Sequence, residues 1–168
     1  MNSGCLMKER IHIHIGEFHA SSKPVVIHTV LGSCVSVCLI DTIRFSGGMN
    51  HILMPGQTDL FNLKESARYG INAMELLLDS LTGLGSDRKR LVAKVFGGAH
   101  VISSISKENG VGLKNISFVL DFLEKEKIPI TSMDVGGSDS RKIFFHTDSG
   151  NVFLKRIPSL LMTNADND

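Results

Sequence analysis

Two side chains in the first third of the chain have the chemistry of a hydrolase, the thiol of Cys34 and the imidazole of His51. A thiol attacks a carbonyl carbon as its thiolate, so it needs an open approach and a base nearby. Cys34 follows the small, flexible stretch 31–33 at the start of a β-rich segment, where another chain can come close. The alternative is a cysteine buried in the core, because cysteine packs like a small apolar residue.

A hairpin would bring the thiol and the imidazole together. Cys34 opens the segment 33–40, and His51 lies in the otherwise apolar segment 47–54. If these segments pair around Thr42-Ile43, Cys34 lies directly opposite His51, with their Cβ atoms ~5 Å apart. A slip of one residue would put the two on opposite faces of the sheet. The sequence therefore predicts a Cys–His pair that depends on register, and a half-buried histidine without a catalytic role is the alternative.

The remaining cysteines and histidines have weaker patterns. Three cysteines in a chain with no export signal indicate free thiols, and nothing in the sequence assigns a role to Cys5 or Cys38. His12 and His14 share a strand face and could ligate a metal, but a solvated face is the simpler interpretation. We therefore predict neither a metal nor a cofactor.

Glycine pairs recur at 47–48, 97–98 and 136–137 without fitting a phosphate-binding motif. Tight turns and close backbone approach explain them better. Asp134 and Arg141 flank the last pair, and the sequence favours a surface ion pair for them over a catalytic role.

Periodicity predicts the elements that must position these residues. In the segment 33–40, Cys34 and Cys38 alternate with the apolar residues and share the opposite face. Strands come first, followed by helix, strand, helix and further strands, an order that favours an α+β fold or a layered sandwich over a doubly wound sheet. The expected strands are 11–15, 25–31, 33–40, 47–54, 91–96, 130–135, 141–147 and 151–157, and the expected helices are 66–81 and 114–125.

Length and composition limit the class of protein. The 168 residues suit one domain, 1–168, with a core at about 10–157 and a frayed polar tail at 163–168. A net charge of +1 gives no reason to expect nucleic acid or an anionic membrane as partner. No apolar run approaches the ~20 residues that span a bilayer, and the charged N-terminal stretch lacks the apolar core of a signal peptide. We therefore predict a cytoplasmic protein.

Several motifs together resemble the chemoreceptor glutamine deamidase family, CheD. The central pair is LGSCV at 31–35 and GGMNHILMP at 47–55, with Met54 where the family pattern has leucine. The similarity covers roughly residues 10 to 157. Further matches are Arg68-Tyr69-Gly70, the stretch 94–99, Gly112 to Asn115, and Asp134 to Gly137 followed by Arg141 to Ile143.

The resemblance implies roles for individual residues. The nucleophilic cysteine of the family falls on Cys34 and its histidine on His51. The third member is a threonine shortly before the cysteine, which falls on Thr29, or on the position of His28 where the family spacing is six. Since these two neighbours face opposite ways in a regular strand, only one can serve. The implied fold is a layered α/β sandwich of mostly antiparallel strands with two main helices, similar to the catalytic domain of the cytotoxic necrotizing factor toxins.

The resemblance also implies an activity. It is the hydrolysis of glutamine side chains on methyl-accepting chemotaxis receptors to glutamate, with release of ammonia and a cysteine thioester intermediate. The partners would be the cytoplasmic helices of these receptors and, as for some members, a CheC-type phosphatase. A non-catalytic regulator that binds the receptor or CheC is the competing hypothesis, and a related cysteine hydrolase such as a methylesterase or protease is a third. The sequence does not identify the receptors or their glutamines.

Overall fold

The computed structural model describes residues 7–54, 63–101 and 110–159. The predicted frayed tail, Cys5 and most of the loop after Pro55 lie outside these ranges. The strands are β1 (Glu9–His12), β2 (Phe18–Ser21), β3 (Val25–Leu31), β4 (Val35–Asp41), β5 (Ser46–Asn50), β6 (Leu91–Gly97), β7 (Ile130–Val135), β8 (Ser140–His146) and β9 (Val152–Ile157). The helices are α1 (Leu63–Gly83), the short 3-10 helix η2 (Arg88–Arg90) and α2 (Val111–Lys125).

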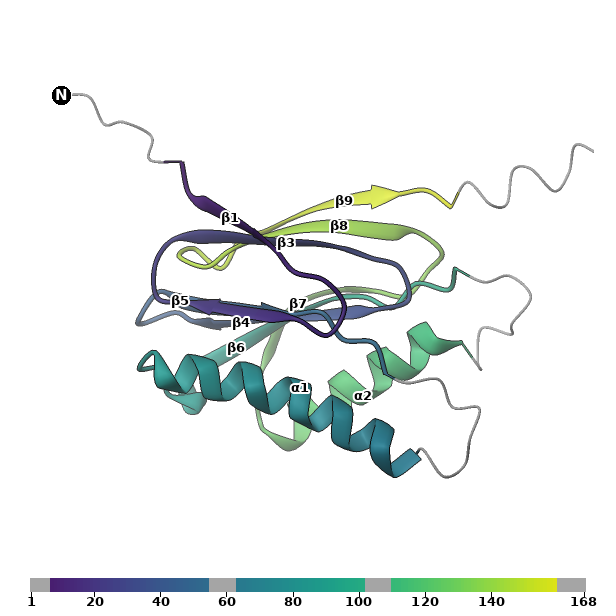
Figure 1. Ribbon diagram of the computed structural model, residues 1–168, viewed down its shortest axis with the longest axis horizontal. Coiled ribbons are helices and arrows are strands. Elements are labelled where there is room, and N and C mark those ends of the chain that lie inside the picture. Colours follow the sequence, from purple (N-terminus) through teal and green to yellow (C-terminus); the bar gives the residue numbers. More distant parts are fainter. Residues whose placement is uncertain (1–6, 55–62, 102–109, 160–168) are drawn as a thin grey trace, which may run out of the picture.

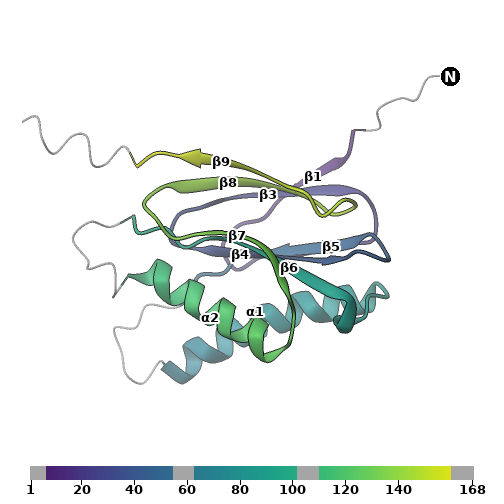
Figure 2. The same ribbon diagram turned by 180° about the vertical axis from the view of Figure 1, so that it is seen from behind.

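These elements form three layers (Figure 1). A four-stranded sheet, in the order β1-β3-β8-β9, lies over a five-stranded sheet, in the order β2-β5-β4-β6-β7. Both α-helices cover the other face of the five-stranded sheet, as the view from behind also shows (Figure 2). Most strand pairs are antiparallel, so the predicted layered α+β sandwich with two main helices is confirmed.

The differences from the predicted elements concern edges and pairing. The strand β2 was not predicted, and it pairs with β5 at the edge of the five-stranded sheet. Two pairs, β1 with β3 and β6 with β7, are parallel. Both helices begin three residues earlier than periodicity predicts, at Leu63 and Val111.

The strand β4 separates two apolar cores. Val35, Val37 and Leu39 pack against the helices. Cys34 and Cys38 face the other way, into the core between the two sheets. The predicted division of this segment into two faces is therefore confirmed, and it sets both thiols in the layer between the sheets.

The helix α1 has the apolar stripe that periodicity predicts at four of its five positions, and the fifth, Ile71, is exposed. Met74, Leu77, Leu78 and Leu81 are fully buried against the five-stranded sheet. Glu75 and Asp79 lie on its outward side, where Arg88 forms ion pairs with both. In the described ranges, no helix combines the length and apolar character needed to cross a bilayer.

Candidate active site

The hairpin that carries Cys34 and His51 differs in register from the prediction. Val35 pairs with Ile52 through two backbone hydrogen bonds of 3.0 and 2.8 Å. This pairing puts Ser36, and not Cys34, opposite His51, so the predicted register is wrong by two positions. A shift of two preserves the face, because side chains alternate with a period of two. Cys34 and His51 therefore still share the face toward the four-stranded sheet, as diagonal neighbours.

The turn explains the shift in register. The chain turns through residues 42–45, and the centre of the hairpin lies one residue later than Thr42-Ile43. The Asp41 carboxylate accepts hydrogen bonds from the backbone N–H groups of Ile43 and Arg44. Phe45 closes the turn with a left-handed φ of 56°. Aspartate often stabilises a turn by accepting hydrogen bonds from the backbone N–H groups that follow it. Here this stabilisation outweighs the poor turn propensity of the neighbouring residues.

Thr29 is the residue that reaches His51 from the other sheet. Its side chain is buried, and its Oγ1 lies 2.8 Å from His51 Nδ1. His28 faces the opposite side of β3, where its ring stacks on those of His12 and Phe144. Of the two candidates that the sequence leaves open, the structure brings Thr29 to His51 and points His28 away.

The Thr29 hydroxyl determines which ring nitrogen of His51 carries the proton. It donates to the backbone carbonyl of Ile13 at 2.7 Å, and a carbonyl can only accept. Having used its one proton, the hydroxyl must accept from His51, so Nδ1 carries the hydrogen. The neutral ring then has its lone pair on Nε2, as a general base requires.

His51 and Cys34 line the same pocket. The pocket has a volume of about 610 Å³, and its wall includes Thr29, Cys34 and His51 together with the rim residues His12 and His14. Nε2 is buried and has no hydrogen-bond partner among the residues that the structure describes. The predicted thiol–imidazole contact is thus not formed at rest, although both groups line one cavity. Such contacts often tighten only when substrate binds.

Both groups are electrically neutral at rest. Burial lowers the pKa of His51 to about 4, with a further contribution from His12 and His14. Burial also raises the pKa of the Cys34 thiol, against a smaller lowering by its own backbone N–H. A thiolate–imidazolium pair needs the opposite shifts. At neutral pH the pocket therefore holds a thiol beside an unprotonated base.

The lowered pKa of His51 predicts a dependence of stability on pH. Between pH 4 and about 6.5, the folded state binds fewer protons at this ring than the unfolded state does. The free energy of unfolding should therefore fall as the pH drops through this window, by about 3 kcal/mol for His51 alone. Urea unfolding at several pH values between 7 and 4 measures it.

The matched variant is His51→Asn, which retains an N–H donor for Thr29 and cannot titrate. His28 and His146 also have lowered pKa values, so the comparison of wild type with variant isolates His51. The stability advantage of the wild type should shrink as the pH falls. A constant difference from pH 7 to pH 4 would contradict the shift.

Hydrogen bonds to the segment 97–99 hold the backbone around Cys34 in place. Gly98 N–H donates to the Cys34 carbonyl at 2.8 Å, and Ala99 N–H donates to the Gly32 carbonyl at 2.9 Å. Gly97 has a φ of 109°, and a Cβ there would lie 2.2 Å from the Cys34 carbonyl oxygen. The interpretation of this glycine pair as a point of close backbone approach is correct, and what it approaches is the backbone of the candidate nucleophile.

Asn115 of α2 is a positioning residue that the sequence interpretation did not assign. It is fully buried, and its Nδ2 donates to the Ser33 carbonyl at 2.8 Å. Its Oδ1 accepts from Met54 N–H at 3.0 Å. One amide thus ties the segment before Cys34 to the segment after His51. The signals in the sequence are a polar residue on the apolar stripe of the helix and the place of Asn115 at the end of the matching motif at 112–115.

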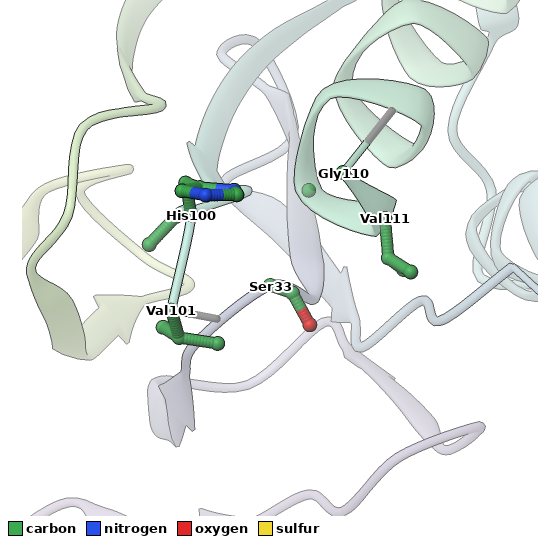
Figure 3. A pocket seen from close by; sticks show the side chains of 7 residues that line it. Ser33, His100, Val101, Gly110 and Val111 are labelled. Atoms are coloured by element: carbon green, nitrogen blue, oxygen red, sulfur yellow. The ribbon is translucent and has the colours of Figure 1, made fainter. Parts of the chain in front are cut away.

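A small second pocket adjoins the site at the start of α2. Figure 3 shows Ser33 between the segment of His100 and Val101 and the helix start at Gly110 and Val111. This second pocket has a volume of about 50 Å³, and it shares Ser33 and Val101 with the larger pocket. The start of α2 thus borders a pocket that adjoins the one lined by Cys34.

Arg141 is buried, which corrects the prediction of a surface ion pair. Its side chain is 2% exposed, and its Nε donates to Asp134 at 2.8 Å. The same guanidinium donates to the carbonyls of Gly97 and Gly136. The pair therefore braces the glycine segments beside Cys34 from inside the protein.

Metal ligation has little support in this geometry. No group of three or more histidine, cysteine or acidic side chains in the described part of the chain could hold a metal ion. His12 stacks on His28, with ring centroids 4.9 Å apart, and also contacts His14. These imidazoles form an aromatic cluster at the rim of the pocket. Cys34 and Cys38 are both free thiols.

Comparison with known proteins gives one consistent result. The family model described as CheD chemotactic sensory transduction matches residues 53–156, a segment that begins just after the three site residues. A probable chemoreceptor glutamine deamidase, CheD 1, of Dechloromonas aromatica is 43% identical over 84% of this chain and 70% of its own length. Similarly named proteins of Shewanella oneidensis (41% identical, 91% of this chain and 75% of the relative) and Anaeromyxobacter dehalogenans (38%, 89% and 86%) also match. The chain belongs to the CheD family.

Proposed function

We propose that the protein is a cysteine amidohydrolase that converts glutamine side chains of chemotaxis receptors to glutamate in the cytoplasm. The observation that carries the chemistry is the Thr29–His51 hydrogen bond, which leaves an unprotonated Nε2 without a described partner on a histidine that lines the pocket of Cys34. The names of the relatives, chemoreceptor glutamine deamidases, support the choice of substrate.

In the first half of the reaction, His51 Nε2 takes the proton of Cys34 as the sulfur attacks the carboxamide carbon. The C–S bond forms, and the C=O electrons move to oxygen. The backbone N–H of Cys34 lies beside its own sulfur and is the candidate donor to this oxyanion. The protonated ring then gives its proton to the leaving nitrogen, ammonia departs and a thioester remains.

In the second half, water replaces ammonia. His51 Nε2 takes a proton from the water as its oxygen attacks the thioester carbon. The C–S bond breaks, the proton returns to sulfur and glutamate leaves. Thr29 holds Nδ1–H throughout, so the ring presents the same nitrogen to thiol, ammonia and water.

The test uses a purified cytoplasmic fragment of a chemoreceptor. The wild-type protein should release ammonia in step with a one-dalton mass gain at individual glutamines, located by peptide mass spectrometry. Hydroxylamine should attack the thioester, free the Cys34 thiol and leave a γ-glutamyl hydroxamate on the receptor fragment. Methanol release or peptide cleavage without ammonia would instead assign the site to an esterase or a protease.

Replacing Thr29 by valine should lower kcat about 10- to 100-fold. Valine has the same shape but can neither accept from His51 Nδ1–H nor donate to the Ile13 carbonyl. The ring is then free to take the other tautomer, whose Nε2 carries a proton and cannot act as base. The measurement is the rate of ammonia release, with ¹⁵N NMR of the imidazole to report the tautomer.

Thr29→Ser is the matched control, because it retains the hydroxyl and loses one methyl group. It should keep most of the activity and the Nδ1–H tautomer. Equal loss in the serine and valine variants would mean that the hydroxyl does not act through the ring.

A further inference from the structure

The outer face of the four-stranded sheet has an unusual charge. In β3 and β8 the inward positions include Thr29, Ile143 and Phe145, so the alternate residues face outward. The outward positions of the four strands include three cations and three imidazoles, Arg10, Lys142, Lys155, His12, His28 and His146. Glu9 is the only acidic residue in these four strands, and it occupies an inward position in the alternation, as its strand partner Val25 does.

These three cations have no ion-pair partner in the part of the chain that the structure describes. No ion pair among the described residues includes Arg10, Lys142 or Lys155. The outward strand positions carry these three cations and no carboxylate, and the nearby Asp148 carboxylate is paired with Lys8 beside His146. Since the whole chain has a net charge of +1, these positions concentrate positive charge on one side. The helices cover the opposite side of the molecule, and no element of the described chain covers this face (Figure 1).

Apolar side chains lie between the charges. Phe153 is 59% exposed and Val30 is 46% exposed. Phe144 stacks on His28, and the Lys142 ammonium lies 5.4 Å from the centroid of the Phe144 ring. Exposed apolar side chains among unpaired charges are typical of a surface that another macromolecule covers.

This face continues into the pocket of Cys34. His12 and Val30 belong to the outer face and also line the pocket. A macromolecule that inserts a side chain between the sheets must therefore lie against the rim that these residues form. The same molecule can extend across the cations without leaving the surface.

We propose that the outer face of the four-stranded sheet docks a carboxylate-rich segment of the protein whose glutamine enters the pocket. The inference rests on the proposed function. Carboxylates complement Arg10, Lys142 and Lys155, and apolar side chains between them cover Phe153 and Val30. The face thus selects the substrate protein, while the pocket selects the glutamine.

The test compares two double charge reversals in the full chain. Arg10→Glu/Lys142→Glu changes the outer face, and Lys89→Glu/Lys125→Glu makes the same change in net charge on η2 and α2. With a receptor cytoplasmic fragment, the first should raise KM about tenfold with kcat changed less than about twofold. The second should leave KM within about twofold of the wild type. Raising NaCl from about 25 to about 300 mM should raise KM of the wild type more than that of the first variant.

Binding of the same fragment to Cys34→Ala, measured by titration calorimetry, separates this proposal from the proposed function. If the wild type releases no ammonia, the function fails, and salt-sensitive binding that is lost on reversal of Arg10 and Lys142 still supports the docking face. Equal KM and equal binding in the two double variants would overturn the docking face. So would a single-stranded oligonucleotide that binds the outer face more tightly than the receptor fragment, because the face would then serve nucleic acid.

Discussion

Replacing Cys34 by alanine should lower the rate of ammonia release at least about 10⁴-fold, because the proposed thioester forms on its sulfur. The side chain lies at the wall of the pocket, 7% exposed, so the loss of one sulfur atom should cost little stability. The receptor fragment should still bind. Ammonia release is followed with a coupled enzyme assay, and the unfolding midpoint in urea reports the fold.

Cys38 gives the matched control four residues along the chain. It shares the face of Cys34 but is fully buried in the core between the sheets, away from the pocket. Burial raises its pKa far above the usual thiol value. Cys38→Ala should lose stability, by about 1 kcal/mol, and retain kcat. Activity that survives at Cys34→Ala and disappears at Cys38→Ala would overturn the assignment of the nucleophile.

Alkylation distinguishes the same two thiols without substitution. Iodoacetamide should modify Cys34 and leave Cys38 untouched in the folded protein, because Cys34 lines the large pocket whereas Cys38 is fully buried. Since the pKa of Cys34 is raised, its modification should be slow at neutral pH and accelerate as the pH increases. A fast, pH-independent reaction would indicate a resting thiolate.

Replacing Gly97 by alanine should destabilise the protein by about 2–5 kcal/mol and disturb the site with it. Its φ of 109° is strained for any residue with a Cβ. The new Cβ would also lie 2.2 Å from the Cys34 carbonyl oxygen, which accepts from Gly98 N–H. To relieve this contact, either the backbone of Cys34 or the strand β6 must move. Stability is measured by urea unfolding and the site by the alkylation rate of Cys34.

Substitutions at two other glycines separate the two causes of this destabilisation, backbone strain and the contact with the Cys34 carbonyl. Gly136 has a φ of 80° with nothing within 4 Å of its Cβ position, so Gly136→Ala measures the backbone strain alone, about 1–2 kcal/mol. Gly83, at the end of α1, has open space and no positive φ, so Gly83→Ala should be neutral or slightly stabilising. If Gly97→Ala cost no more than Gly136→Ala, the contact with Cys34 would be unimportant.

Alternation was the most informative pattern in the sequence. It correctly assigned Cys34 and Cys38 to one face of β4 and the apolar residues to the other. It could not fix the register of the β4–β5 pair, because the Asp41 side chain sets the turn and this capping is not visible in periodicity. The predicted register was wrong by two residues, and because two is an even number, His51 still lies on the predicted face of the sheet.

The choice between Thr29 and His28 needed the structure for a similar reason. Both faces of β3 carry aliphatic residues, Val26 and Val30 on one and Ile27 and Leu31 on the other, so hydrophobicity did not mark the inward side. The parallel pairing of β1 with β3 could not be predicted from the sequence either. It depends on contacts between distant segments, whereas local propensity describes each segment alone.

The hydrogen bond from His51 to Thr29 joins two different sheets, since Thr29 belongs to β3 and the chain of His51 continues from β5. A chain in which only one sheet has formed has the cysteine without an oriented base. The orientation of the candidate base therefore depends on the packing of the two sheets against each other. If the proposed function holds, amide hydrolysis requires both sheets to be in place, and any opening between them removes the orienting contact of His51 before either sheet is lost.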